Sequence, residues 1–188
     1  MHFMKLRWPV WSACVVWALV FNAHAFWGKD HEEPPPIIRT EPPSAAEVKA
    51  LGFGNRAMND QLPRFGLSRH TPLIPDWSKA NAGKLLASWN TAPQAGRHPT
   101  LVIQHGGVGG PGSTDYGHAR WFLAQGFNVL VLDSFWSRGF IANWRKIDAP
   151  ASQHGPSFST LGANTRARDA FAAARWLREQ PQVDPSRI

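Results

Sequence analysis

The residues IQHGGVGGPGSTD, positions 103–115, place several glycines and a proline between an apolar run and a predicted helix. Glycine-rich turns of this kind expose backbone N–H groups. Such groups can hold the phosphates of a nucleotide, or they can stabilise the oxyanion that forms when an ester is attacked. The two uses imply different reactions, so residues outside the turn must decide between them.

Two nucleotide-binding motifs can be compared with this turn. Gly107–Gly112 match GxGxxG after a predicted strand, and Asp133 ends the next predicted strand, where a carboxylate could hold a ribose. The helix cap is predicted at residues 113–115, after the last glycine, and Pro111 removes one N–H from the turn. The phosphate-loop pattern GxxxxGK[ST] fails because Ser113 stands where a lysine is needed. A nucleotide-binding α/β domain therefore remains the weaker alternative.

Strands and helices are predicted to alternate around the turn. The segments that carry this prediction are strands at 84–91, 100–104 and 127–132, and helices at 113–125 and 164–180. The strands at 100–104 and 127–132 are fully apolar, which predicts burial on both faces of a mostly parallel sheet. The last helix is expected to bury one face, formed by Ala167, Ala170, Phe171, Ala174 and Leu177. Ligands of such sheets bind beyond the carboxyl ends of the strands, where 105–112 and 133–138 both fall.

Three stretches together resemble the dienelactone hydrolase-like family of the α/β-hydrolases. They are PTLVIQHGGVGG (99–110), ARWFLAQGFNVLVLDSFWSRG (119–139) and RARDAFAAARWLREQPQVDPSRI (166–188). The resemblance covers about residues 84–188. It implies the N-terminal part of an α/β-hydrolase-type, mostly parallel three-layer sandwich with an incomplete sheet. It also implies a serine hydrolase that opens an ester or lactone through an acyl-enzyme, with a small-molecule substrate, no cofactor and no metal.

The resemblance also implies roles for individual residues. The backbone N–H of Gly107 would donate to the oxyanion, and His105 and Gly106 would shape the turn. One such donor contributes roughly 3 kcal/mol to lowering the barrier. Asp133 and Arg138 would pair or brace the loop above the site.

The nucleophile, acid and base of a catalytic triad are expected to lie outside these residues. The sequence contains no GxSxG motif, which in this superfamily comes before the acid and the histidine. The available hydroxyls and bases are not predicted to lie on an exposed strand-to-helix turn; they are Ser113, Ser134, Ser137, Ser157, Ser159, His118 and His154. We therefore expect a truncated, inactive N-terminal half that leaves the strand at 127–132 or its neighbour uncovered. A non-catalytic, vestigial α/β binding module is the alternative.

The N-terminus has the pattern of a secretory signal peptide. Lys5 and Arg7 precede an apolar run at 9–21, and the small residues of Ala23-His24-Ala25 predict cleavage after Ala25. The apolar run is shorter than the roughly 20 residues that span a bilayer, so no stable membrane anchor is expected after cleavage. The sequence therefore predicts a secreted or periplasmic protein whose signal peptide occupies residues 1–25.

The mature chain would contain no thiol, because the single cysteine, Cys14, lies inside the predicted signal peptide. This excludes disulfides and cysteine nucleophiles. The net charge of +7 falls to +5 when Lys5 and Arg7 are removed, and the remaining basic residues are scattered. Nucleic-acid binding is therefore not expected.

The mature chain is predicted to have two parts. Residues 26–80 form an exposed leader, rich in proline and charge, followed by an irregular segment. The leader part ends in a short helix at 44–51, which begins with the capping box Ser44-Ala-Ala-Glu47. Residues 81–188 form the N-terminal half of the hydrolase domain.

Overall fold

The computed structural model describes residues 34–52, 62–78, 83–107, 109–143, 145–150, 152 and 161–188. The predicted signal peptide and the start of the leader lie outside these residues. The described elements, in chain order, are α2 (Ala45–Ala50), η1 (Leu62–Phe65), β1 (Thr71–Pro75), β2 (Lys84–Asn90), β3 (Thr100–Gln104), α3 (Ser113–Ala124), β4 (Asn128–Asp133), η2 (Trp136–Arg138), β5 (Phe140–Ala142), β6 (Arg145–Lys146) and α4 (Ala163–Arg178).

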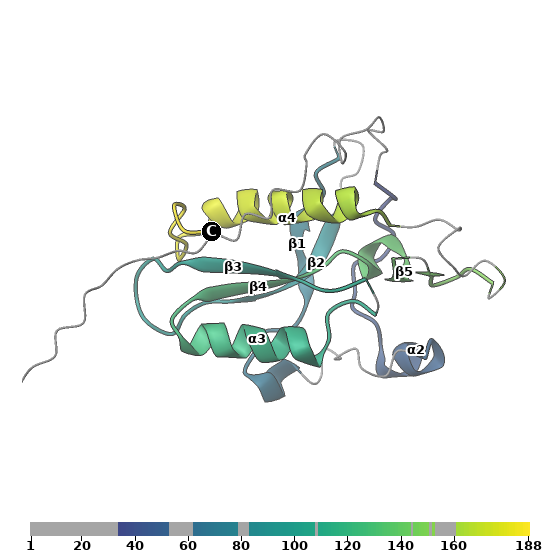
Figure 1. Cartoon of the computed structure of the whole chain (residues 1–188), viewed down its shortest axis with the longest axis horizontal. Coiled ribbons are helices and arrows are strands. Elements are labelled where there is room, and N and C mark those ends of the chain that lie inside the picture. The colour runs from purple at the N-terminus through teal and green to yellow at the C-terminus, as the bar shows by residue number, and fades with distance from the viewer. Residues whose placement is uncertain are drawn as a thin grey trace, which may run out of the picture. The chain divides into compact units, whose positions relative to one another are not determined.

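Four strands form one sheet in the order β1-β2-β4-β3 (Figure 1). The β1–β2 and β2–β4 pairings are antiparallel, and only the β3–β4 pairing is parallel. The chain is thus of the α/β class, but the prediction of a mostly parallel three-layer sandwich was wrong for the described residues. The reason is β2, which runs against the other three strands. The connection from β1 to β2 is too short for the crossover that a parallel pair requires.

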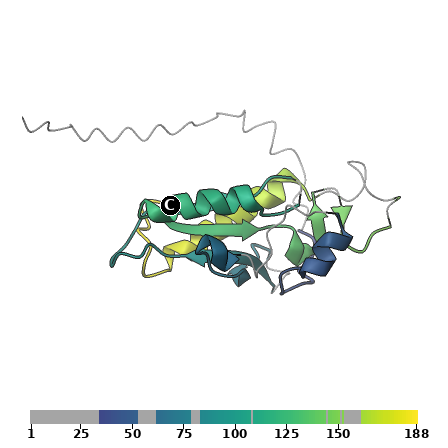
Figure 2. The ribbon, with the colours of Figure 1, turned by 90° about the horizontal axis from the view of Figure 1, so that it is seen from below.

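Helices α3 and α4 cover opposite faces of this sheet (Figures 1 and 2). Alternate residues of β4 face the two helices, because side chains along a strand point to opposite faces. Leu130 and Leu132 pack with α4, whereas Val129 and Val131 pack with α3. All of β4 is buried, since β2 and β3 flank it on both sides. Each of these leucines contributes about 2 kcal/mol by leaving water.

The buried face of α4 differs from the predicted one. Ala172, Ala173 and Leu177 pack against the sheet, together with the carboxylate of Asp169, whereas Phe171 is 73% exposed. Of the predicted face, Leu177 is buried as expected, whereas Ala167 and Phe171 are exposed, because the buried side of the helix also includes Asp169. The buried partner of this carboxylate comes from a distant part of the chain.

No strand was predicted in the segment that forms β1. Its sequence is Thr-Pro-Leu-Ile-Pro, and proline cannot donate a hydrogen bond within a sheet. Both prolines are tolerated because β1 lies at the edge of the sheet, with an irregularity between Pro72 and Ile74. An edge strand needs backbone partners on one side only.

Strand β3 is only half-buried along Leu101–Gln104, contrary to the expected burial on both faces. It is the end strand of the described sheet. On its outer side the chain that follows α4 lies beside its first residue, where the N–H of Thr100 donates to the carbonyl of Arg187. The parallel strands β3 and β4 end at the same end of the sheet, so the segments that follow them are neighbours.

Candidate functional site

His105 joins the glycine turn after β3 to the loop after β4. The ring is buried, with its Nδ1 2.7 Å from the carbonyl oxygen of Gly106, and its Nε2 accepts the N–H of Ser134 at 3.2 Å. The ring also contacts Phe135 edge-on, with centroids 4.4 Å apart. Since Nε2 accepts a hydrogen bond, its partners assign the proton to Nδ1. His105 therefore fixes the turn relative to the loop after β4.

The two glycines after His105 have different surroundings. A Cβ atom on Gly107 would lie 3.3 Å from Nδ2 of Asn143, whereas a Cβ atom on Gly106 would meet nothing within 4 Å. The carbonyl of Gly107 also accepts the backbone N–H of Asn143 at 3.0 Å. A side chain at position 107 would therefore press on the carboxamide of Asn143.

Arg166, in the first turn of α4, also contacts the glycine turn after β3. Its Nη2 donates to the carbonyl of His105, its own carbonyl accepts Gln104 Nε2 at 2.8 Å, and its guanidinium lies 5.3 Å from the Phe135 ring. Burial lowers the pKa of Arg166, while Asp169 opposes this shift. Arg166 was not among the predicted site residues. Its signal is a cation at a helix N-terminus, where cations are disfavoured.

Asp133 is buried at the end of β4 and forms hydrogen bonds within its own loop. Its Oδ1 accepts the N–H groups of Phe135 at 2.9 Å and Trp136 at 3.1 Å, and it lies 3.9 Å from His105 Nε2. These bonds fix the start of η2. Asp133 therefore braces the loop, and its carboxylate is buried rather than open to a ribose.

Arg138 forms its ion pairs with two aspartates from other elements. Its guanidinium donates to both carboxylate oxygens of Asp169 at 2.8 and 2.9 Å, and to Asp76 at 3.0 Å, and all three side chains are fully buried. A bidentate arginine–carboxylate pair is among the strongest hydrogen-bonded contacts in proteins. Arg138 therefore connects η2 to α4 and to the end of β1. Asp133 does not pair with it and forms its hydrogen bonds within its own loop.

The pKa of Asp169 reflects the buried charges around it. Burial raises the pKa of Asp169, and the neighbouring Asp76 raises it further, whereas Arg138 lowers it. The sequence analysis did not single out Asp76 or Asp169. The signal for Asp169 was an isolated carboxylate on the apolar side of a helix, which is buried only when it has a partner.

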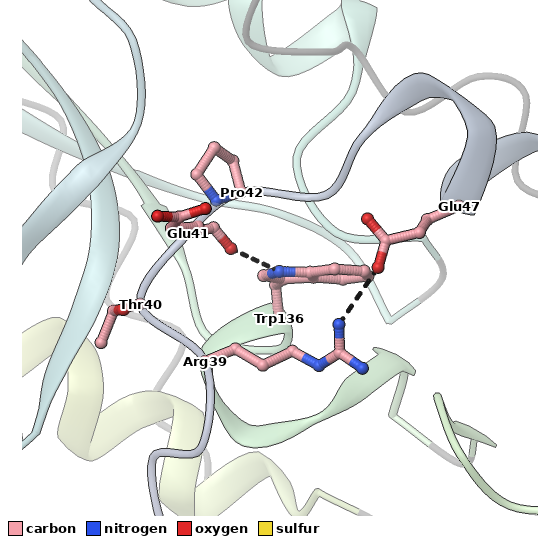
Figure 3. A pocket seen from close by; sticks show the side chains of 6 residues that line it. All are labelled: Arg39, Thr40, Glu41, Pro42, Glu47 and Trp136. Atoms are coloured by element: carbon pink, nitrogen blue, oxygen red, sulfur yellow. Dashed lines mark hydrogen bonds and ion pairs between the residues drawn. The ribbon is translucent and has the colours of Figure 1, made fainter.

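The end of the predicted leader is attached to this loop, contrary to the expected exposed segment. The N–H groups of Ile38 and Arg39 donate to the carbonyl of Ser137 at 2.8 and 3.1 Å, and Trp136 Nε1 donates to the carbonyl of Glu41 at 2.6 Å (Figure 3). Its prolines prevent this segment from forming a helix. The backbone N–H groups of the segment instead donate to a carbonyl of η2.

Arg39 adds side-chain contacts to this attachment. Its guanidinium pairs with Glu47 of α2 at 3.2 Å and with Asp148 at 3.4 Å, and lies 4.9 Å from the Trp136 ring (Figure 3). A pocket of about 210 Å³ is lined by Arg39, Glu47 and Trp136, with Thr40, Glu41 and Pro42 (Figure 3). The capping box of α2 is present, with Glu47 Oε2 accepting the Ser44 N–H at 2.9 Å.

The start of α3 argues against a phosphate in the glycine turn. The N-cap is Gly112, one residue earlier than predicted, so the helix does begin at the last glycine. However, Asp115 Oδ2 accepts the N–H of Gly112 at 2.8 Å. This places a negative charge at the helix end that a phosphate would need.

The described serines of the sequence analysis are not arranged as nucleophiles. The hydroxyl of Ser134 accepts Gln104 Nε2 at 3.1 Å, and that of Ser137 accepts the N–H of Leu86 at 3.1 Å; both serines are fully buried. Ser113 and His118 are exposed on α3. The remaining candidates, Ser157, Ser159 and His154, lie outside the described residues.

Within the described ranges, no group of three or more acidic, histidine or cysteine side chains could hold a metal ion. Nor does a helix within those ranges have the length and apolar character needed to cross a membrane. Comparison of the chain with known protein families and with curated proteins finds no match to either.

Proposed function

We propose that this chain forms the oxyanion-binding part of a secreted or periplasmic serine hydrolase that resembles the dienelactone hydrolase-like family. The observation that carries the proposal is the position of Gly107, in a turn at the carboxyl end of β3. Three contacts fix this turn, from His105, Asn143 and Arg166. A donor that is held in place before the reaction costs no reorganisation when charge develops on the substrate oxygen.

The strand arrangement supports the same proposal. The described sheet has the order β1-β2-β4-β3, and Gly107 follows β3, the third of its strands in the chain. The oxyanion turn of α/β-hydrolases follows the third strand, which is where Gly107 stands here.

In the proposed reaction, a serine attacks the carbonyl carbon of an ester or lactone and the alcohol leaves, giving an acyl-serine that water then hydrolyses. Gly107 donates its N–H to the oxyanion in both steps. His105 and Arg166 hold the turn, and Asp133 and Arg138 brace the neighbouring loop. Because the 188 residues contain no GxSxG motif, the proposal assigns the nucleophile to a segment outside them.

The test compares two proteins with 4-nitrophenyl acetate as substrate. One is the 188-residue chain, and the other is the product of the reading frame continued past Ile188. We expect hydrolysis by the longer product only. A continued frame that encodes no GxSxG, or a longer product without esterase activity, contradicts the proposal and favours the non-catalytic binding module.

A further inference from the structure

We propose that the side-chain carboxamide of Asn143 is a second donor to the anion that Gly107 binds. This inference deepens the proposed function and rests on it. It assigns a substrate-contacting role to a residue that sequence patterns did not single out.

The first argument is the position of Asn143. Its backbone is held on both sides, because its N–H donates to the carbonyl of Gly107 at 3.0 Å and its carbonyl accepts the N–H of Leu161 at 2.6 Å. The carboxamide lies along Gly107, with Nδ2 nearer than Oδ1 to the position of a Cβ atom there, 3.3 against 3.7 Å. The donor end of the side chain therefore lies next to the proposed oxyanion turn.

The second argument concerns the carboxamide of this side chain. Asn143 is half-buried, and its Oδ1 is buried without a hydrogen bond among the residues that the structure describes. A buried acceptor without a partner costs stability that an apolar side chain of similar size would not cost. An anion would bind the Nδ2 end of this carboxamide, because an amide oxygen cannot donate, and side-chain amides are among the donors that stabilise oxyanions.

The third argument is the charge near the turn. The guanidinium of Arg166 bonds to the carbonyl of His105, two residues before Gly107, and is half-buried. A partly desolvated cation at this position favours an anion in the same site. In the proposed site, Gly107 supplies a backbone donor, Asn143 supplies a side-chain donor, and Arg166 adds positive charge near the turn.

The experiment titrates the ¹⁵N-labelled 188-residue chain with ethyl methylphosphonate, a tetrahedral monoanion that resembles the intermediate of ester hydrolysis. Chemical shifts of the Gly107 N–H and thermal unfolding are both followed. The variants are Asn143→Ala and Asn143→Asp, with Gln94→Ala as a control for loss of an exposed carboxamide.

We expect a saturable shift of Gly107 in the wild type and in Gln94→Ala. Binding should weaken about tenfold or more in Asn143→Ala, since a hydrogen bond to a charged group is lost. It should disappear in Asn143→Asp, whose carboxylate repels the anion. The melting temperature of Asn143→Ala should equal or exceed that of the wild type, which a structural role would not allow.

Two results would overturn the inference, and they differ in their consequence. If Asn143→Ala binds as tightly as the wild type, or if it melts lower while binding is unchanged, Asn143 has a structural role and the proposed function stands. If Gly107 does not respond in the wild type, the anion site itself is absent, and the proposed function fails with it.

Discussion

Among single residues, Gly106 and Gly107 differ in the space that a side chain would have. The sequence motif treats Gly106 and Gly107 alike, whereas the structure surrounds only Gly107 with atoms of another segment. Sequence reasoning identified the turn and its position after a strand. It missed Asn143 and Arg166, because their contacts depend on where distant parts of the chain fold.

Alanine substitutions test this difference. Gly107→Ala should lower the free energy of unfolding by about 1 kcal/mol relative to Gly106→Ala, because the new methyl group presses on the Asn143 amide. Gly106→Ala should be neutral or slightly stabilising, since alanine restricts the unfolded chain. Chemical denaturation measures both variants, and equal stabilities would show that the turn tolerates a side chain at either position.

Arg138→Met tests the buried charge cluster. The substitution leaves Asp76 and Asp169 buried without a cation, and such uncompensated charge costs about 3–5 kcal/mol. Arg120→Met, at an exposed position of α3, is the control and should change the free energy of unfolding by about 0.5 kcal/mol or less.

The decrease in the free energy of unfolding of Arg138→Met should depend on pH. Burial and Asp76 already raise the pKa of Asp169, and removal of Arg138 raises this pKa further. A carboxyl group with a higher pKa in the folded than in the unfolded chain destabilises the fold as pH rises. The deficit should therefore be smaller at pH 5 than at pH 8. A deficit that grows on acidification would show that the cluster is not the cause.

At the scale of elements, the sequence predicted β2, β3, α3, β4 and α4 to within about two residues at each end. These segments have strong apolar patterns and clear end signals. Proline-rich segments were less predictable. Neither β1 nor the attachment of residues 37–42 follows from local patterns, because each depends on backbone partners that are distant in sequence.

Arg39→Ala tests the attachment of this segment to η2. The variant loses two partly exposed ion pairs and a contact with Trp136. Together these contacts stabilise the attachment by about 1 kcal/mol. Hydrogen exchange of the Ile38 amide and the Trp136 indole should become about fivefold faster, while the amide of Val131 in β4 is unaffected. Lys49→Ala in α2 is the control, and a similar acceleration there would contradict a specific role for Arg39.

Asp184→Asn tests the turn that brings the end of the chain beside β3. Ser186 and Arg187 donate to this carboxylate and lower the pKa of Asp184 to about 2 from the usual 3.8. A lowered carboxyl pKa stabilises the fold above the unfolded value and loses this effect as pH falls. The variant should therefore melt below the wild type at pH 7, and the difference should shrink between pH 4 and pH 2. A constant difference would contradict this account.

At the scale of the whole molecule, the glycine turn, the braced loop after β4 and the first turn of α4 meet at one end of the sheet. Their contacts come from His105, Asn143, Arg166 and Arg138. The sequence indicated that parallel strands would bring 105–112 and 133–138 together, and β3 and β4 do so. It could not predict the reversed β2, because strand direction depends on the connection through the unrecognised β1.

In the proposed enzyme, this end of the sheet binds the oxyanion formed by a serine nucleophile located outside the 188 residues. The most direct measurement is fluorophosphonate labelling of the secreted or periplasmic protein made from the intact gene, followed by mass spectrometry of the modified peptide. We predict a labelled serine within a GxSxG sequence that lies C-terminal to Ile188. Absence of labelling, or a label on a serine between residues 26 and 188, would contradict the claim.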